Sequence, residues 1–328
     1  MQDKLMTDRE IKRKINKHEI ATRKKKRKCF LTSCNNFSIA SHLLQKNGIL
    51  NRIATDNHLF QFGIDPYKPN LFYFEKIGIN KAFTFPGFCN KHDTSIFNEI
   101  ESEELDFSRY RTNLLFSYRI LANELRKKEI LIDRFTSILN DFSLNLYLNN
   151  RYTSDLKDRI KGHKQSLKDG EYYLKHFYSD LENNTKSFTF ITIELPYVEF
   201  CASGVFTYET TAEINSIPDW LWDKPLTDIY FNLLPLQDKS IAIFGCLTEM
   251  KDKCWNYISE FDKPDKNSSL KMIGDLLLTR VENWLCSESV YNHLKLYEST
   301  IMKITHESIN TPHERRTLSF NLFDYMKQ

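Results

Sequence analysis

The clearest pattern along the chain is an alternation of apolar positions at spacings of four and three in its middle. The first run comprises Leu114, Tyr118, Leu121, Leu125, Ile132, Phe135, Leu139 and Phe142, with Lys128 as a single interruption. The second comprises Leu156, Ile160, His163, Leu167, Gly170, Leu174, Phe177 and Leu181. Residues at this spacing share one face of a helix, and the polar residues 149–153 offer a turn between the runs. We therefore predict two long antiparallel helices that pack on each other, on the rest of the chain, or on a second copy in a homodimer.

Beyond residue 184 the pattern changes to short segments rich in β-branched and aromatic residues. They cover residues 187–194, 198–208, 228–234 and 240–247, and prolines separate them. Such segments predict the strands of one mainly antiparallel sheet. Residues 250–261 and 270–297 are expected to be helices, the second beginning at the N-capping side chains of residues 267–269.

The N-terminal third shows neither pattern, which divides the chain into four parts. With 328 residues the chain is long enough for two or three domains. We expect an α+β protein composed of a basic arm (1–28), a small metal-dependent module (29–105), the helical hairpin (106–184) and an α+β domain (185–328).

The charge of the chain is concentrated at its beginning. The net charge is +3, whereas residues 1–28 contain twelve Lys or Arg against four Asp or Glu, a net charge of +8, so the remainder carries −5. Lys and Arg release condensed counterions when they neutralise a nucleic-acid backbone. The arm therefore favours contact with DNA or RNA, and a solvated terminus is the alternative.

The cysteines and the absence of long apolar runs bear on the compartment. Seven cysteines, an odd number, follow no secretory signal, which favours reduced thiols over a disulfide framework. No window approaches the roughly 20 apolar residues of a membrane span. We expect a soluble, cytoplasmic protein without a membrane partner.

Two short motifs carry metal-binding chemistry. Four residues lie between Cys29 and Cys34, which form a turn, and two residues lie between Cys89 and His92, the gap of a zinc knuckle. Four soft-to-borderline ligands in two close pairs fit tetrahedral Zn²⁺. Nearby lysines favour the thiolate form that the metal requires. The sequence predicts a structural zinc site, with buried free thiols as the competing account.

The residues around these motifs resemble the zinc-supported HNH nucleases, over residues 29–101 only. A Cys pair is followed by a polar residue and His42, and then by the second pair and Asp93. The resemblance implies a treble-clef-like ββα fold, with His42 as the general base and Asp93 as a ligand of a catalytic Mg²⁺ or Mn²⁺. The family's other metal ligand falls on Ser41, a poor ligand, and its central Asn has no clear equivalent. The overall order of the chain also resembles uncharacterised bacterial proteins.

Three classes of function remain open. The first is a zinc-binding, nucleic-acid-associated protein whose degenerate HNH-like module acts as a metal-dependent nuclease, for which bacterial defence is the analogous setting. The second is a non-catalytic, zinc-stabilised scaffold that binds a partner. The third, a small-molecule enzyme centred on the C-terminal domain, requires a polar pocket that no motif marks. The chain lacks the glycine-rich phosphate loop, the dinucleotide fingerprint and the serine-hydrolase elbow.

Overall fold

Seven strands form the central sheet, in the order β3-β2-β9-β6-β7-β8-β5, and every neighbouring pair is antiparallel. The computed structural model describes residues 6–31, 33–64, 72–102, 104–218, 224–311 and 313–327. The strands of this sheet are β2 (His58–Ile64), β3 (Phe72–Gly78), β5 (Phe188–Pro196), β6 (Phe200–Thr207), β7 (Asp228–Pro235), β8 (Lys239–Leu247) and β9 (Trp284–Cys286). The four strands predicted from composition correspond to β5–β8, and their antiparallel pairing is confirmed.

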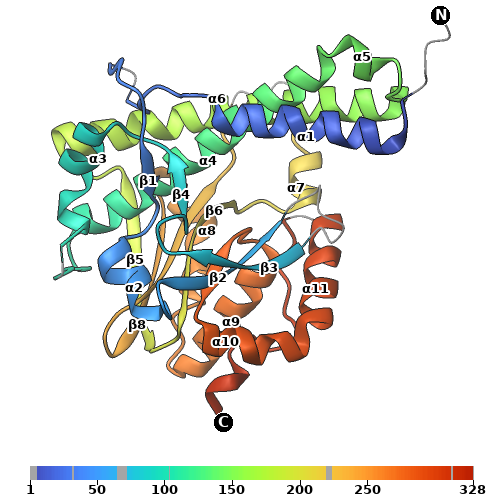
Figure 1. The fold of residues 1–328 in the computed structure, drawn as a ribbon. Coiled ribbons are helices and arrows are strands. Elements are labelled where there is room, and N and C mark those ends of the chain that lie inside the picture. Colours follow the sequence, from blue (N-terminus) through green and yellow to red (C-terminus); the bar gives the residue numbers. More distant parts are fainter. Residues whose placement is uncertain are drawn as a thin grey trace, which may run out of the picture.

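Helices cover both faces of the sheet (Figure 1). Along β7, Tyr230 and Leu234 belong to the core on one face, and Phe231 and Leu233 to the core on the other. Successive side chains of β7 thus point to opposite faces, and both faces are buried. This pattern is typical of a sheet that lies between two layers of helices. One outer layer contains α8 (Lys251–Ser259), α9 (Lys266–Thr279), α10 (Glu288–Leu294) and α11 (Glu298–Asn310), and the other contains α4 (Tyr110–Leu139) and α6 (Asn150–Asn183).

The helical hairpin forms as predicted from the apolar seams. The seam residues of α4 and α6 pack on each other and on the sheet within one chain. A Cβ on Gly170 of α6 would lie 2.1 Å from Leu125 Cδ2, so the absence of a side chain there lets the helices approach closely. The turn expected at residues 149–153 lies earlier, over residues 140–149, because the Asn149 side chain caps α6 by accepting a hydrogen bond from the Tyr152 N–H at 2.8 Å, so residues 150–153 are already helical. The short helix α5 (Phe142–Asn145) precedes it.

The helix predicted over residues 270–297 is wrong. Helix α9 begins earlier, because Asp265 accepts hydrogen bonds from the N–H groups of Asn267 and Ser268, and it ends at Thr279. Within the predicted range the structure has the fully buried strand β9, between β2 and β6, and then α10. A short apolar run such as Trp284–Cys286 is compatible with a buried helix or a buried strand, and only its partners decide which.

Residues 29–105 contribute to two sheets. Strands β1 (Ala40–His42) and β4 (Thr84–Pro86) form a separate antiparallel pair, which is followed by α3 (Asn90–Phe97). Between β1 and β4, the chain makes the short helix α2 (Asn51–Ile53) and the strands β2 and β3, which extend the central sheet through β9. This segment therefore shares its core with the C-terminal strands.

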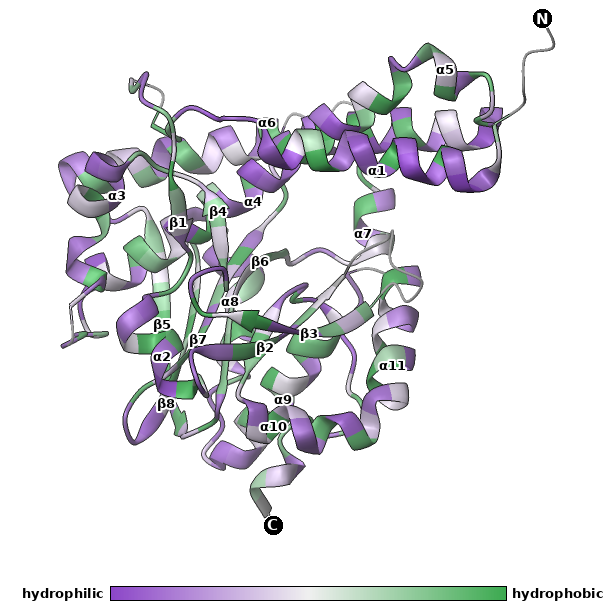
Figure 2. Ribbon diagram, in the orientation of Figure 1, coloured by the Kyte–Doolittle hydropathy of each residue, from purple (hydrophilic) through white to green (hydrophobic). Residues whose placement is uncertain are grey.

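The basic arm is a helix. Helix α1 (Asp8–Lys24) begins with a capping box formed by Thr7 and Glu10. Its apolar residues Ile11 and Ile15 pack against the far end of the hairpin, and its outer face is hydrophilic (Figure 2). Within the described ranges, no helix combines the length and the apolar character needed to cross a bilayer.

Candidate metal centre

The first pair of predicted ligands lies in a tight turn after α1. The Cys34 N–H donates to the Leu31 carbonyl at 3.0 Å, and the Cys29 N–H donates to the Asn36 carbonyl at 2.8 Å. These bonds bring the two side chains to the same side of the turn. Cys29 is buried and Cys34 is half-buried.

The second pair lies at the beginning of α3. Cys89 occupies the N-cap position and His92 the first turn, so both side chains lie at the helix N-terminus. Two backbone hydrogen bonds connect this segment to the first turn: Phe30 N–H donates to the Gly87 carbonyl at 2.9 Å, and Ile39 N–H donates to the Phe88 carbonyl at 2.8 Å. The two pairs therefore meet, although 54 residues of sequence separate Cys34 from Cys89.

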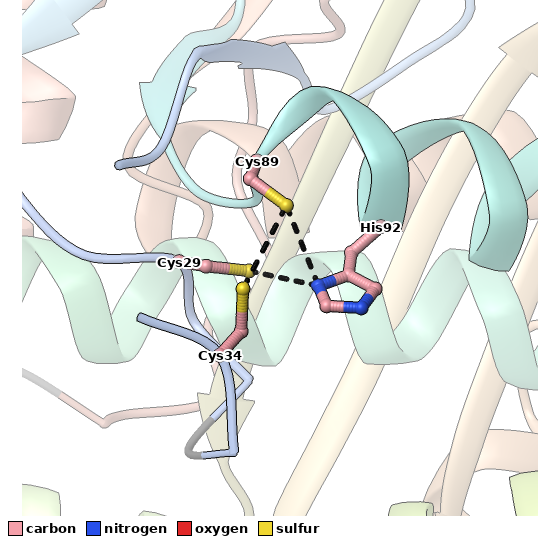
Figure 3. A group of neighbouring side chains, drawn as sticks. All are labelled: Cys29, Cys34, Cys89 and His92. Atoms are coloured by element: carbon pink, nitrogen blue, oxygen red, sulfur yellow. Dashed lines mark hydrogen bonds between the residues drawn. The ribbon is translucent and has the colours of Figure 1, made fainter. Parts of the chain in front are cut away.

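The four side chains point toward one another (Figure 3). Their ligand atoms all lie within 4.8 Å of one another, a group that can hold a metal ion. The His92 Nδ1 is 3.4 Å from the Sγ atoms of both Cys29 and Cys89, and the Sγ atoms of Cys34 and Cys89 are 3.9 Å apart. In the part of the chain that the structure describes, this is the only group of three or more His, Cys, Asp or Glu side chains with this property.

The local electrostatics differ between the buried thiols. The backbone N–H of His92 lowers the pKa of the Cys89 thiol, as expected at a helix N-terminus, where N–H groups are unpaired. Burial raises the pKa of the Cys29 thiol. A metal cation would favour the thiolate form of both.

Helix α4 contacts the turn that holds the first ligand pair. Arg126 is buried, its Nη2 donates to the Lys28 carbonyl at 2.8 Å, and its guanidinium lies 5.7 Å from the centre of the Phe30 ring. No sequence motif marks Arg126. Its only signal in the sequence is its position, because a charged residue directly after Leu125 lies beside the apolar seam of the predicted hairpin.

No known protein family, curated protein or solved structure matches this chain. The chemistry of the site therefore comes from the arrangement of its own residues.

The predicted catalytic residues lie beside the cluster and not in it. His42 ends β1, is half-buried, and contacts the Ile79 carbonyl through Nε2 at 3.3 Å; burial lowers its pKa. The hydroxyl of Ser41 accepts a hydrogen bond from the Phe88 N–H at 3.1 Å, so it has a structural role. In contrast, Asp93 Oδ1 is buried and has no hydrogen-bond partner.

Two further carboxylates, Glu99 and Glu101, follow the cluster. They form ion pairs with Arg111 and Arg119 at 2.6 and 2.7 Å. These ion pairs attach the segment after α3 to α4. The negative charge of each carboxylate is therefore already neutralised by an arginine.

The charge of the basic arm is only partly available to a partner. Arg27 is buried and pairs with Asp133 of α4 at 2.9 Å, and Lys25 pairs with the same carboxylate at 2.8 Å. Five exposed cations of α1 make neither a hydrogen bond nor an ion pair among the described residues: Arg9, Lys12, Arg13, Lys17 and Lys24. The exposed aromatic Phe37, beneath Lys26, continues this surface toward the metal centre.

Proposed function

We propose that Cys29, Cys34, Cys89 and His92 bind one structural Zn²⁺. Tetrahedral zinc with bonds of about 2.3 Å to sulfur and about 2.0–2.1 Å to nitrogen places two sulfurs about 3.8 Å apart and a sulfur and a nitrogen about 3.6 Å apart. The separations of 3.9 Å and 3.4 Å in the cluster fit this geometry closely. Four protein ligands leave no position for water, which is typical of a structural site.

The order of the elements supports a treble-clef-like module. A turn with two ligands, the antiparallel pair β1 and β4, and a helix with two ligands at its N-terminus follow one another, as in the HNH-type modules that the sequence resembles. The insertion of β2 and β3 between β1 and β4 accounts for the wide spacing of the ligand pairs.

We infer that the zinc-stabilised module and α1 together form a nucleic-acid-binding surface. The metal cluster is the observation that carries this function, since it fixes the turn directly after the basic helix. The five unpaired cations of α1 supply sequence-independent phosphate contacts, and Phe37 offers a ring on which a base can stack. None of the seven cysteines is in a disulfide, which fits a thiolate zinc site in the reducing cytoplasm.

A metal-dependent nuclease is the second candidate. The orphaned oxygen of Asp93 favours it, because a buried carboxylate oxygen without a donor is a suitable ligand for Mg²⁺ or Mn²⁺. In this reading His42 is the general base that activates water for attack on a phosphodiester. Cleavage of DNA or RNA in Mn²⁺ by the wild type, lost in both His42→Ala and Asp93→Asn, is expected if the module is active. Equal cleavage by the variants would refute these roles.

Elemental analysis of protein purified without an affinity metal tests the zinc proposal. We expect about one zinc per chain in the wild type and in His42→Ala, and loss of the metal in Cys89→Ser. Cys254→Ser is the matched control, because Cys254 is buried outside the cluster and its thiol donates to the Met250 carbonyl, which a hydroxyl can also do. A wild type without zinc would refute the proposal, as would equal loss in Cys89→Ser and Cys254→Ser.

A further inference from the structure

A cavity of about 320 Å³, with both charged and apolar side chains in its wall, lies between the hairpin and the sheet, away from the metal cluster. Its wall is formed by α4, α6, the end of β6, the beginning of β7, the end of α9 and the region of α11. This size is at the lower end of the range for small-molecule sites in proteins, about 300–1,000 Å³. One signal in the sequence marks it: Lys128, the single interruption of the first apolar seam, lines the cavity.

Four charged side chains in the wall have no ion-pair partner. Lys128 makes no hydrogen bond or ion pair with a described residue. Arg280 has no carboxylate partner there either; its Nη2 donates to the Thr207 carbonyl, and its Nη1 is buried without an acceptor. Asp169 accepts a hydrogen bond from Gln165 at 3.0 Å, and neither Asp169 nor Asp228 has a cation within ion-pair distance in the described part of the chain.

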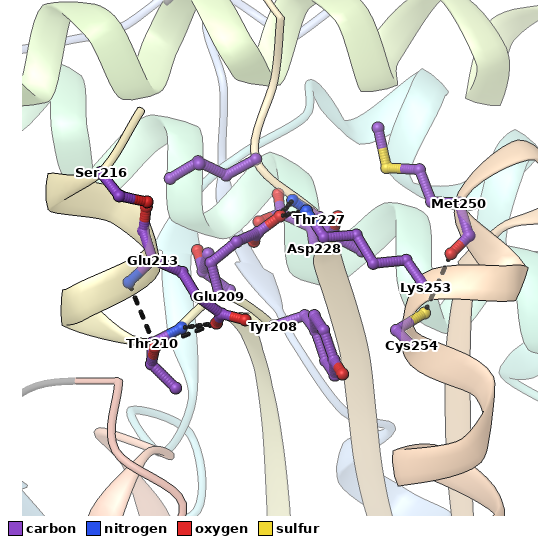
Figure 4. Close-up of polar contacts among 12 residues, drawn as sticks. Tyr208, Glu209, Thr210, Glu213, Ser216, Thr227, Asp228, Met250, Lys253 and Cys254 are labelled. Atoms are coloured by element: carbon purple, nitrogen blue, oxygen red, sulfur yellow. Dashed lines mark hydrogen bonds and ion pairs between the residues drawn. The ribbon is translucent and has the colours of Figure 1, made fainter. Parts of the chain in front are cut away.

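A buried carboxylate next to the cavity, in contrast, is paired. Glu209, adjacent to the cavity, is buried, accepts two hydrogen bonds from Thr227 and pairs with Lys253 (Figure 4). Partly buried charges without partners are costly unless a bound group compensates them. Four of them around one cavity therefore indicate a ligand that carries both an anion and hydrogen-bond donors.

Cations and carboxyl groups lie together in the cavity. Burial lowers the pKa of His313, and the positive charges of Arg280 and Lys128 lower it further, so both cations lie near this histidine. Burial raises the pKa of Asp228 to about 7; the carboxylates of Asp169 and Glu209 contribute to the rise, and the charge of Lys128 opposes it. The cavity thus presents cationic donors and carboxyl groups that accept hydrogen bonds.

We propose that this cavity binds a small phosphorylated molecule with free hydroxyl groups, such as a nucleotide or a sugar phosphate. Lys128 and Arg280 bind the phosphate, whose oxygens satisfy the unpartnered guanidinium nitrogen. Asp169 and Asp228 accept hydrogen bonds from hydroxyl groups of the sugar. The site is separate from the metal cluster and does not depend on the function proposed for it.

Isothermal titration calorimetry with AMP, ribose 5-phosphate, adenosine and inorganic phosphate tests the proposal. We expect AMP or ribose 5-phosphate to bind at least about tenfold more tightly than adenosine or inorganic phosphate, because only they engage both the cations and the carboxyl groups of the cavity. Preference for AMP identifies a nucleotide, and equal binding identifies a sugar phosphate; both results support the proposal. No difference among the four probes overturns it.

Two variants localise the binding. Lys128→Met keeps the length of the side chain and removes its charge, and it should weaken binding of the phosphorylated probe at least about tenfold. Lys161→Met is the matched control, because Lys161 is exposed on α6 and does not line the cavity. Asp228→Asn, which replaces a carboxyl group by an amide of the same shape, should weaken binding of the same probe, and unchanged near-UV circular dichroism would exclude a folding defect. Wild-type affinity in both Lys128→Met and Asp228→Asn would overturn the assignment.

Discussion

The exposed face of α1 makes a quantitative prediction about salt. If each of its five unpaired cations neutralises one phosphate of duplex DNA, the logarithm of the binding constant should fall with the logarithm of the salt concentration with a slope of about −4.5. Replacing Arg13 and Lys17 by Gln removes two of the five, which lie one turn apart on the same face. The slope should then be about −2.7, and the affinity at about 0.1 M salt should fall roughly 60-fold.

Fluorescence anisotropy with a labelled DNA duplex of arbitrary sequence, at several salt concentrations, measures both quantities. Gln preserves helix propensity, and the two side chains are exposed, so stability should change by less than about 0.5 kcal/mol. The control replaces Lys295 and Lys303 by Gln, which removes the same charge from exposed positions at the C-terminal end of the fold. An unchanged slope in the α1 variant, or an equal change in both variants, would refute phosphate contact by α1.

Three further outcomes are expected. Chelation of the metal should make the three cluster thiols reactive toward Ellman's reagent while the fold persists. The four thiols outside the cluster should stay unreactive, because their residues have 0% exposure. Reaction of all seven together would contradict a local role for the metal. Gly170→Ala should destabilise the protein by about 1–3 kcal/mol in urea unfolding, because the added Cβ overlaps the side chain of Leu125. Leu125→Ala in the same chain should recover part of that loss. Strictly additive effects of the two substitutions would exclude the overlap. The Ser143 hydroxyl and His18 hold the pKa of Asp141 well below its usual value, so this carboxylate stabilises the fold above about pH 4 and the contribution is lost as pH falls through the folded pKa. Thermal melts should show that the stability lost in Asp141→Asn is largest at pH 6 and shrinks progressively as the pH is lowered below about 4; a constant difference would contradict this.

The sequence was most informative where one local pattern determines the structure. The two apolar seams predicted α4 and α6, because a helix forms all its hydrogen bonds within one segment. The strands β5–β8 were also recognisable, since each is a bounded run of β-branched and aromatic residues. The four members of the Cys/His cluster were recognised from spacing, since Cys89 and His92 lie in one helical turn; that they bind zinc stays a prediction.

The remaining features depend on partners that are distant along the chain. Strand β9 was predicted as helix, because three apolar residues become a strand only between β2 and β6. The participation of β2 in the same sheet as β9 was also beyond local reasoning. The cavity was missed for the same reason: Lys128, Asp169, Asp228 and Arg280 come from four elements, and only tertiary packing brings them together.

The pairing of β2 with β9 also bears on the order of folding. Gln61 contacts Asn283 across 222 positions of sequence, so during synthesis β2 and β3 must wait for β9 before their sheet is complete. An isolated two-stranded hairpin is marginally stable in water, and Phe60 and Phe62 would be exposed during that interval. All four members of the Cys/His cluster, however, are available once residue 92 has left the ribosome. A metal bound to them would close the ends of this segment early and protect the nascent chain until β9 follows.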